Sequence, residues 1–123
     1  MLLTTNPGTS LPPGAVERYR IELTAQRIEA DGKLVPSANL SFEEIDHLVR
    51  TCKVHPKIVG SSSGEFLDAF KAMGRAHPGE DVVTVLSSRK IIGTVLSAEW
   101  ARDVLRDDPE FRDRRFHVVD SKA

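Results

Sequence analysis

Apolar and polar positions along the chain predict strands that alternate with helices. The Val-rich run Asp81–Leu86 has the length and β-branched content of a buried strand. A polar loop, Ser87–Lys90, follows, and then a helix whose apolar residues recur at helical spacing: Val95, Leu96, Trp100, Val104 and Leu105. Loops at the carboxyl ends of strands in an open α/β sheet bind ligands, because N–H groups at the start of the next helix point there. We therefore expect function near Ser87–Thr94.

The same patterns predict the elements on either side. Met1–Thr5 is expected to form a short strand, and Ala15–Arg18 a short helix. Arg20–Glu29 alternates apolar and polar residues, which predicts one strand with a wet face, and Asp31-Gly32 predicts a hairpin turn into Leu34 and Val35. Phe116–Val119 is expected to be the last strand, whereas Cys52–Val59 shows no clear pattern.

Two further helices carry a start signal. Ser41 and Glu44 form an S-x-x-E capping box before an apolar face. Ser62 and Glu65 form a second one, so the glycine- and serine-rich stretch 60–64 is interpreted as a helix N-terminus instead of a linker. Strands that alternate with helices predict a single α/β domain over residues 1–123, with a mostly parallel sheet flanked by helices.

Composition narrows the class of protein. The 123 residues are 40% hydrophobic and 28% charged, which suits a folded domain. A net charge of -1 argues against a nucleic-acid surface, which needs a basic excess. One cysteine excludes an internal disulfide, and no apolar run is long enough to span a membrane. These features predict a cytoplasmic protein without a membrane span.

Candidate chemistry is confined to loops rich in small hydroxyl residues: 6–10, 60–64 and 87–94. If they converge, they can hold a carboxylate or a phosphate. Cys52 and His55 form a lone C-x-x-H pair without the second pair that a zinc site needs. Neither a catalytic set of residues nor a cofactor fingerprint is present, so no enzyme activity, metal or cofactor is expected. The charged turn Arg112–Arg115 is interpreted as a solvated face.

Five segments of the chain carry motifs that are specific in combination: TTNPGTSLPPGAVERYRI, EADGKLVPSANLSFEEI, PKIVGSSSGEFLDAF, LSSRKIIGTVLSAEWA and FHVVDSKA. In this order they are similar to the motifs T-D-S-T-A-D-L-P, I-D-G-K-x-Y, P-x-T-S-Q-P-S-x-x-D-F, S-S-x-L-S-G-T-Y-Q-S-A and V-x-V-I-D-S-K. These are motifs of the DegV family of bacterial fatty-acid-binding proteins, which the chain therefore resembles. The resemblance implies the fold of the family's N-terminal domain, with the second family domain absent from this chain.

The resemblance also implies a function. Family members enclose a long-chain fatty acid and present its carboxylate to a separate kinase for phosphorylation with ATP. Carried over to this chain, the ligand-binding residues are Ser62, Ser88, Gly93 and Thr94. Five positions depart from the family pattern. Ile58, Val59 and Ile92 stand where hydroxyl residues are expected and are interpreted as packing residues, and Asn6 and Pro7 stand where Asp and Ser are expected.

Two functions remain open at this point. The first, which the order of the family motifs favours and which we expect, is lipid binding of the DegV type, with carboxylate contacts that have drifted or are completed by another chain. The second is a degenerate domain that acts as a protein or peptide interaction or dimerisation module without lipid, which the three apolar substitutions favour. Under either function, a domain that lacks its second half is expected to expose apolar surface and to self-associate or bind a partner chain.

Overall fold

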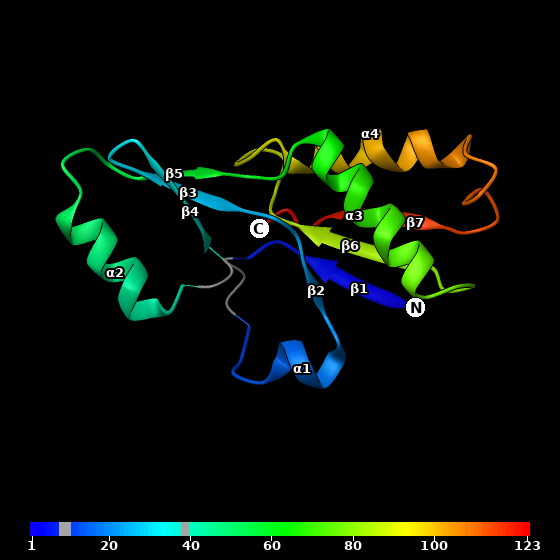
Figure 1. Cartoon of the computed structure of the whole chain (residues 1–123), viewed down its shortest axis with the longest axis horizontal. Helices are drawn as coiled ribbons and strands as arrows, with labels where there is room; N and C mark the ends of the chain where they lie inside the picture. Colours follow the sequence, from blue (N-terminus) through cyan, green and yellow to red (C-terminus); the bar gives the residue numbers. More distant parts are fainter. Residues whose placement is uncertain (8–10, 38–39) are drawn as a thin grey trace.

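The computed structural model describes residues 1–7, 11–37 and 40–123, and its larger sheet is fully parallel (Figure 1). This sheet has the order β2-β1-β6-β7. Its strands are β1 (Leu2–Thr5), β2 (Glu22–Leu23), β6 (Val82–Leu86) and β7 (Phe116–Asp120). The predicted strands at Met1–Thr5, Asp81–Leu86 and Phe116–Val119 are therefore confirmed.

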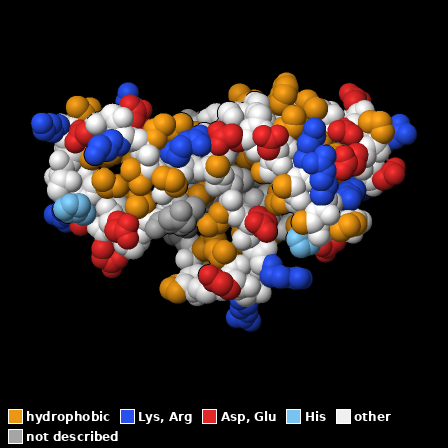
Figure 2. Space-filling view, viewed as in Figure 1, with side chains coloured by type: hydrophobic (Ala, Val, Ile, Leu, Met, Phe, Trp, Pro, Cys, Tyr) orange, Lys and Arg blue, Asp and Glu red, His pale blue; other side chains and the backbone are white. Residues whose placement is uncertain are grey.

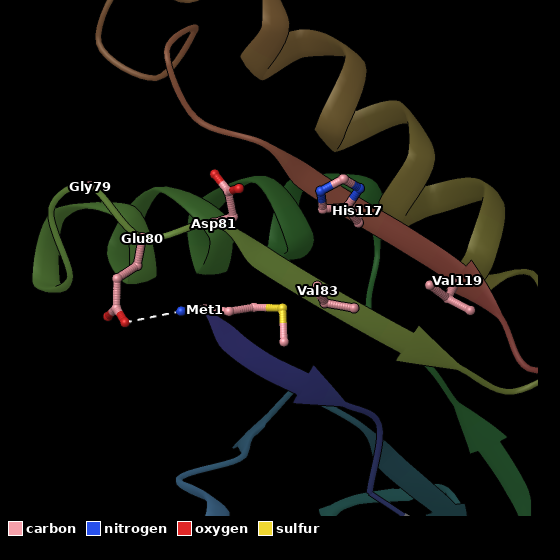
Figure 3. Close-up of a pocket in the computed structure, with 7 residues that line it drawn as sticks. All are labelled: Met1, Gly79, Glu80, Asp81, Val83, His117 and Val119. Atoms are coloured by element: carbon pink, nitrogen blue, oxygen red, sulfur yellow. Dashed lines mark hydrogen bonds and ion pairs between the residues drawn. The ribbon is translucent and has the colours of Figure 1, made fainter.

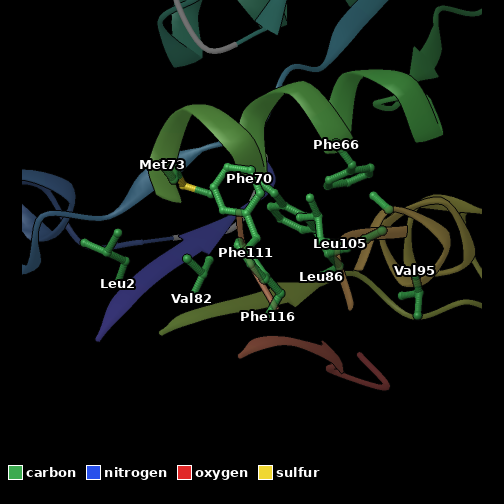
Figure 4. Packing of buried hydrophobic residues seen from close by; sticks show 12 residues of the cluster. Leu2, Phe66, Phe70, Met73, Val82, Leu86, Val95, Leu105, Phe111 and Phe116 are labelled. Atoms are coloured by element: carbon green, nitrogen blue, oxygen red, sulfur yellow. The ribbon is translucent and has the colours of Figure 1, made fainter. Parts of the chain in front are cut away.

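Two helices cover one face of this sheet and build the core with it. They are α3 (Ser63–Ala76) and α4 (Thr94–Arg106), which pack against each other and against β6 and β7. Phe66, Phe70, Phe111 and Phe116 form a chain of ring contacts with centroids 5.5 to 6.2 Å apart (Figure 4). A third helix, α1 (Ala15–Tyr19), connects β1 to β2 along the chain, and none of its residues is buried. The predicted α/β class with a mostly parallel sheet and flanking helices is confirmed.

The other face of the parallel sheet is only partly covered. A hollow of about 550 Å³ lies over it, lined among others by Met1, Val83, His117 and Val119 (Figure 3). The amino group of Met1 donates to the Glu80 carboxylate at 3.1 Å, which fixes the start of β1 beside the start of β6. Leu3, Val83 and Val85 on this face are half-buried, in contrast to the buried neighbours on the helix side.

A second, smaller sheet stands apart from this core. It is antiparallel, with the order β4-β3-β5, and consists of β3 (Arg27–Ala30), β4 (Lys33–Pro36) and β5 (Lys57–Val59). The helix α2 (Phe42–Thr51) connects β4 to β5, and none of its 10 residues is buried. Hydrophobic side chains accordingly gather on the surface of this part of the molecule (Figure 2). We call β3, β4, β5 and α2 together the small lobe.

The single strand predicted over Arg20–Glu29 is wrong. The structure divides it into β2, which pairs with β1 in the parallel sheet, and β3, which belongs to the small lobe. Long-range hydrogen bonds cause the division: Thr24 N–H donates to the Thr5 carbonyl, and the Gln26 carbonyl accepts from Ser37 N–H. The chain thus changes partners between Thr24 and Gln26.

The structure confirms two predictions that rest on neighbouring residues, a hairpin turn and a helix cap. Asp31 and Gly32 both have positive φ, of 49° and 80°, as the predicted β3–β4 hairpin turn requires. The capping box at Ser62 and Glu65 is complete. At Ser41 only half of the predicted box forms. The Ser41 hydroxyl accepts from Glu44 N–H, but the Glu44 carboxylate accepts from this same hydroxyl instead of from the Ser41 N–H. Strand β5 was not predicted.

Candidate functional site

The carboxyl ends of β1 and β6 are tied together by two side chains. Thr5 Oγ1 donates to the Val85 carbonyl at 2.7 Å. One residue further along, Asn6 Oδ1 accepts from Ser87 N–H at 3.2 Å, and Asn6 Nδ2 donates to Ser87 Oγ at 3.2 Å. Two of the hydroxyl-rich loops therefore meet at the edge where an α/β sheet binds ligands. Residues 8–10 of the first loop lie outside the described residues.

A cleft of about 540 Å³ opens at this edge, between the parallel sheet and the small lobe, and we call it the sheet-end cleft. Asn6, Gln26, Ser87 and Thr94 contribute amides and hydroxyls to its lining. Lys57 is the only charged residue among the described lining residues. The remaining lining residues are apolar: Pro7, Pro56, Ile58, Ile91 and Ile92. The cleft thus combines hydrogen-bonding groups, one positive charge and hydrocarbon.

Thr94, the first residue of α4, is the most distinctive residue of the sheet-end cleft. Its side chain is 4% exposed, and its hydroxyl has no hydrogen-bond partner among the described residues. The N-cap residue of α4 is Gly93, so no N-cap side chain accepts a hydrogen bond from the first N–H groups of this helix. A buried hydroxyl without a hydrogen-bond partner lowers the stability of the folded protein. Such a hydroxyl at the ligand-binding edge of a sheet is therefore suited to hydrogen-bond a ligand.

Gly60 holds the small lobe close to Thr94. A Cβ atom at Gly60 would overlap with Thr94 Cγ2 and come within 3.3 Å of Ile92 Cδ1. Only a glycine lets the backbone after β5 approach α4 this closely. The third hydroxyl-rich loop therefore meets the other two through Gly60, although its serines do not line the cleft.

The predicted site residues separate into one that lines the cleft and three that do not. Thr94 lines it. Ser62 is exposed and its hydroxyl caps α3 by accepting from Glu65 N–H at 3.2 Å. Ser88 is 5% exposed and its Oγ accepts from Lys90 N–H at 3.2 Å. Gly93 is exposed at the start of α4. Two of the hydroxyls singled out by the sequence are thus already used in local hydrogen bonds.

The interpretation of Ile58 as a packing residue is wrong, because its side chain is 61% exposed. Ile58 and Ile92 are walls of the sheet-end cleft, and Val59 is half-buried beside them. Sequence reasoning also missed Gln26 and Lys57. Gln26 precedes β3 and Lys57 belongs to β5, and no signal in the sequence shows that these residues lie beside the end of the parallel sheet.

An ion pair attaches the small lobe to the core next to the cleft. Arg27 of β3 makes two hydrogen bonds of 2.8 Å to the two carboxylate oxygens of Glu65 in the first turn of α3. The hydrogen bonds from Arg27, helped by the capping contact with Ser62, lower the pKa of Glu65 to about 2. Ser61 Oγ also donates to the Ala25 carbonyl. These contacts fix the wall of the cleft that carries Gln26.

Other functional signals are limited. Within the described ranges, no group of three His, Cys, Asp or Glu residues is placed to hold a metal ion. None of the helices described is long and apolar enough to cross a membrane.

Comparison with known proteins identifies the family. A sequence model described as "uncharacterised protein, DegV family" matches residues 2–123. A search of curated proteins found no match.

Solved structures share the fold at low sequence identity. A DegV family protein from Thermus thermophilus, described by its fatty acid binding, is 23% identical with a TM-score of 0.79. A stearic-acid-binding protein from Eubacterium ventriosum is 21% identical with a TM-score of 0.82. A DegV family protein from Eubacterium eligens loaded with heptadecanoic acid is 20% identical with a TM-score of 0.73.

These structures are longer than the chain described here. The chain is covered over 99%, 99% and 100% of its length, but it spans only 41%, 42% and 41% of theirs, respectively. The match of the family model over residues 2–123 shows that the chain belongs to the DegV family.

Proposed function

We propose that this chain binds a long-chain fatty acid and holds its carboxylate in the sheet-end cleft. The observation that carries the proposal is the buried Thr94 hydroxyl, which has no partner in the described part of the chain and lies in a cleft lined by a lysine and by isoleucines. A fatty acid has a matching chemistry, since it joins one anionic group to a hydrocarbon chain. Two of the solved relatives are described as fatty-acid-binding and a third as loaded with heptadecanoic acid, which supports the same class of ligand.

Each lining group has a role in this proposal. The Thr94 hydroxyl donates to the carboxylate, and the uncapped N-terminus of α4 after Gly93 adds the favourable end of its dipole. Lys57 supplies a positive charge across the cleft. Ile58, Ile91 and Ile92 contact the first carbons of the acyl chain, so the substitutions that depart from the family pattern become part of the binding surface. Ser62 and Ser88 support the site by capping α3 and shaping the loop after β6.

The experiment is direct binding of palmitate to the purified chain by isothermal titration calorimetry, with a Thr94→Val variant. Valine keeps the shape of the side chain and removes the hydroxyl. A hydrogen bond to a charged carboxylate is worth roughly 1.5 to 3 kcal/mol, so we expect the affinity to fall about 10- to 100-fold. The stability of the variant should not fall, because the hydroxyl has no hydrogen-bond partner among the described residues.

Thr84 offers a matched control. Its hydroxyl is also buried and without a partner among the described residues, but it lies in β6 under the helices and does not line the cleft. Thr84→Val should leave palmitate affinity unchanged. Equal losses in both variants would contradict a role for Thr94. A wild-type chain that takes up no palmitate would refute lipid binding and leave the interaction module as the remaining function.

The family resemblance adds a second step, in which a separate kinase phosphorylates the bound carboxylate with ATP. This step stays a prediction for this chain, as does self-association. The kinase step is tested by incubating the palmitate-loaded chain and ATP with a kinase that phosphorylates fatty acids held by DegV-family proteins, and by measuring acyl phosphate as hydroxamate.

A further inference from the structure

A second hollow, of about 320 Å³, lies where α4 ends and β7 begins, and its lining is strongly basic. This is the end of α4 opposite to the sheet-end cleft, about 20 Å away by the rise of a helix of this length (Figure 1). Five arginines line it together with Phe116 and His117: Arg102, Arg106, Arg112, Arg114 and Arg115. We call it the arginine hollow. The sequence analysis interpreted Arg112–Arg115 as a solvated face, and the folded chain adds two arginines of α4 to them.

The turn that carries three of these arginines is held firmly. Phe111 is 1% exposed and anchors the turn in the core. Arg114 donates from its guanidinium to the Gly74 carbonyl of α3 and lies over the Phe111 ring, 5.7 Å from its centroid. Arg115 N–H donates to the Asp81 carboxylate at 3.0 Å, and Val82 N–H donates to the Arg115 carbonyl at 2.9 Å. The backbone of the arginine hollow is therefore positioned before any ligand arrives.

The charges in the hollow are not balanced from within. Asp103 contacts two of the arginines, at 3.0 Å from Arg102 and 3.2 Å from Arg106. Neither Arg112 nor Arg115 makes an ion pair through its guanidinium with any described residue. Guanidinium groups stay protonated under all ordinary conditions, so they repel one another and cannot relieve this by losing a proton. In a chain of net charge -1, this concentration of positive charge is not a by-product of a basic composition.

We propose that the arginine hollow binds a compact phosphorylated anion, such as a pyrophosphate or the phosphate end of a larger molecule. Guanidinium groups match phosphate oxygens with pairs of parallel hydrogen bonds, which an isolated lysine cannot do. The size of the hollow suits one or two phosphate groups. The Arg112 and Arg115 guanidiniums supply the hydrogen bonds, while Arg114 and Phe111 keep the turn in place. This site is independent of the sheet-end cleft.

The test is isothermal titration calorimetry of the purified chain with inorganic pyrophosphate at low ionic strength. The variant Arg112→Gln/Arg115→Gln removes the two guanidiniums that make neither an ion pair nor a hydrogen bond to a described residue, and it leaves the Arg114 and Phe111 anchors of the turn in place. Since both side chains are exposed, we expect them together to contribute about tenfold in affinity. Binding should weaken as sodium chloride is added, because salt screens exposed charges. A second arm measures sedimentation of the chain with phosphatidylcholine vesicles that contain phosphatidic acid.

A matched control has the same change in charge at a distant place. Arg50→Gln/Lys53→Gln lies on the exposed end of α2 and the loop after it, and it should leave binding unchanged. Loss of pyrophosphate binding in the hollow variant alone supports a soluble phosphate ligand, and the same selective loss in the vesicle arm supports a lipid phosphate. Equal losses in both variants, or no binding of either probe by the wild-type chain, would overturn the proposal.

Discussion

The ion pair between Arg27 and Glu65 can be tested through its dependence on pH. Glu65→Gln removes the carboxylate charge but keeps a side chain that serves in a capping box. In the folded chain the pKa of Glu65 is lowered from 4.5 to about 2 by hydrogen bonds from Arg27. A group with a lowered pKa stabilises the folded state above its unfolded pKa, and this stabilisation is lost as the pH falls through the folded pKa. The relevant window is therefore between about pH 4.5 and pH 2.

The magnitude follows from the shift and the exposure of the pair. The full lowering of the Glu65 pKa corresponds to a contribution of about 3 kcal/mol to the free energy of unfolding. Because the side chains of Arg27 and Glu65 are 29% and 34% exposed, solvent screens part of the interaction. We therefore expect Glu65→Gln to lower the free energy of unfolding by about 1 to 2 kcal/mol at neutral pH.

Urea denaturation followed by circular dichroism at a series of pH values measures this difference. The gap between wild type and Glu65→Gln should be constant above about pH 5 and should close as the pH falls toward about 2. Glu44→Gln is the control, because Glu44 has a similar place in α2 but pairs with no arginine of residues 1–7, 11–37 and 40–123. A gap that does not change with pH, or an equal one for Glu44→Gln, would refute the assignment of the stabilisation to this ion pair.

The remaining predictions concern the small lobe, the helix cap and association. Gly60→Ala should destabilise the chain by about 1 to 3 kcal/mol in urea denaturation, because its Cβ overlaps with buried Thr94; wild-type stability would contradict this close approach. Ser62→Ala should cost about 1 kcal/mol through loss of the α3 cap, and an unchanged urea midpoint would contradict it. Phe42 and Val49 are exposed apolar residues of α2, so we expect the chain to self-associate in light scattering. A monodisperse monomer would contradict this prediction.

The sequence predicted those elements whose signal is local. The Val-rich run of β6 is buried under α3 and α4, and such a strand is recognisable from its residues alone. The capping box at Ser62 and Glu65 likewise depends on neighbours in the chain. In contrast, the division of Arg20–Glu29 into β2 and β3 is decided by partners far away in sequence, at Thr5 and Ser37.

The candidate site was predictable in its place but only partly in its residues. The sequence predicted function near Ser87–Thr94 and left open whether the hydroxyl-rich loops converge; the Asn6 to Ser87 contacts show that the loops after β1 and β6 meet at the sheet edge. The sequence could not predict which hydroxyl lacks a hydrogen-bond partner. The hydroxyls of Ser62 and Ser88 accept from backbone N–H groups, and only the folded loops bring these groups close. Strand β5 is short, follows Pro56 and exposes Ile58, so it has no pattern of its own.

The contrast in burial between the two parts of the molecule has a consequence for motion. The core holds Phe66, Phe70 and Leu105 at 1% exposure or less, whereas α2 buries nothing. Segments with few buried contacts open without unfolding the whole protein. Amide hydrogens of α2 should therefore exchange with deuterium well before those of β6 and α4. If a fatty acid contacts Ile58 on the wall formed by the small lobe, its binding should slow exchange in β5 most, so that the ligand orders the same lobe that admits it.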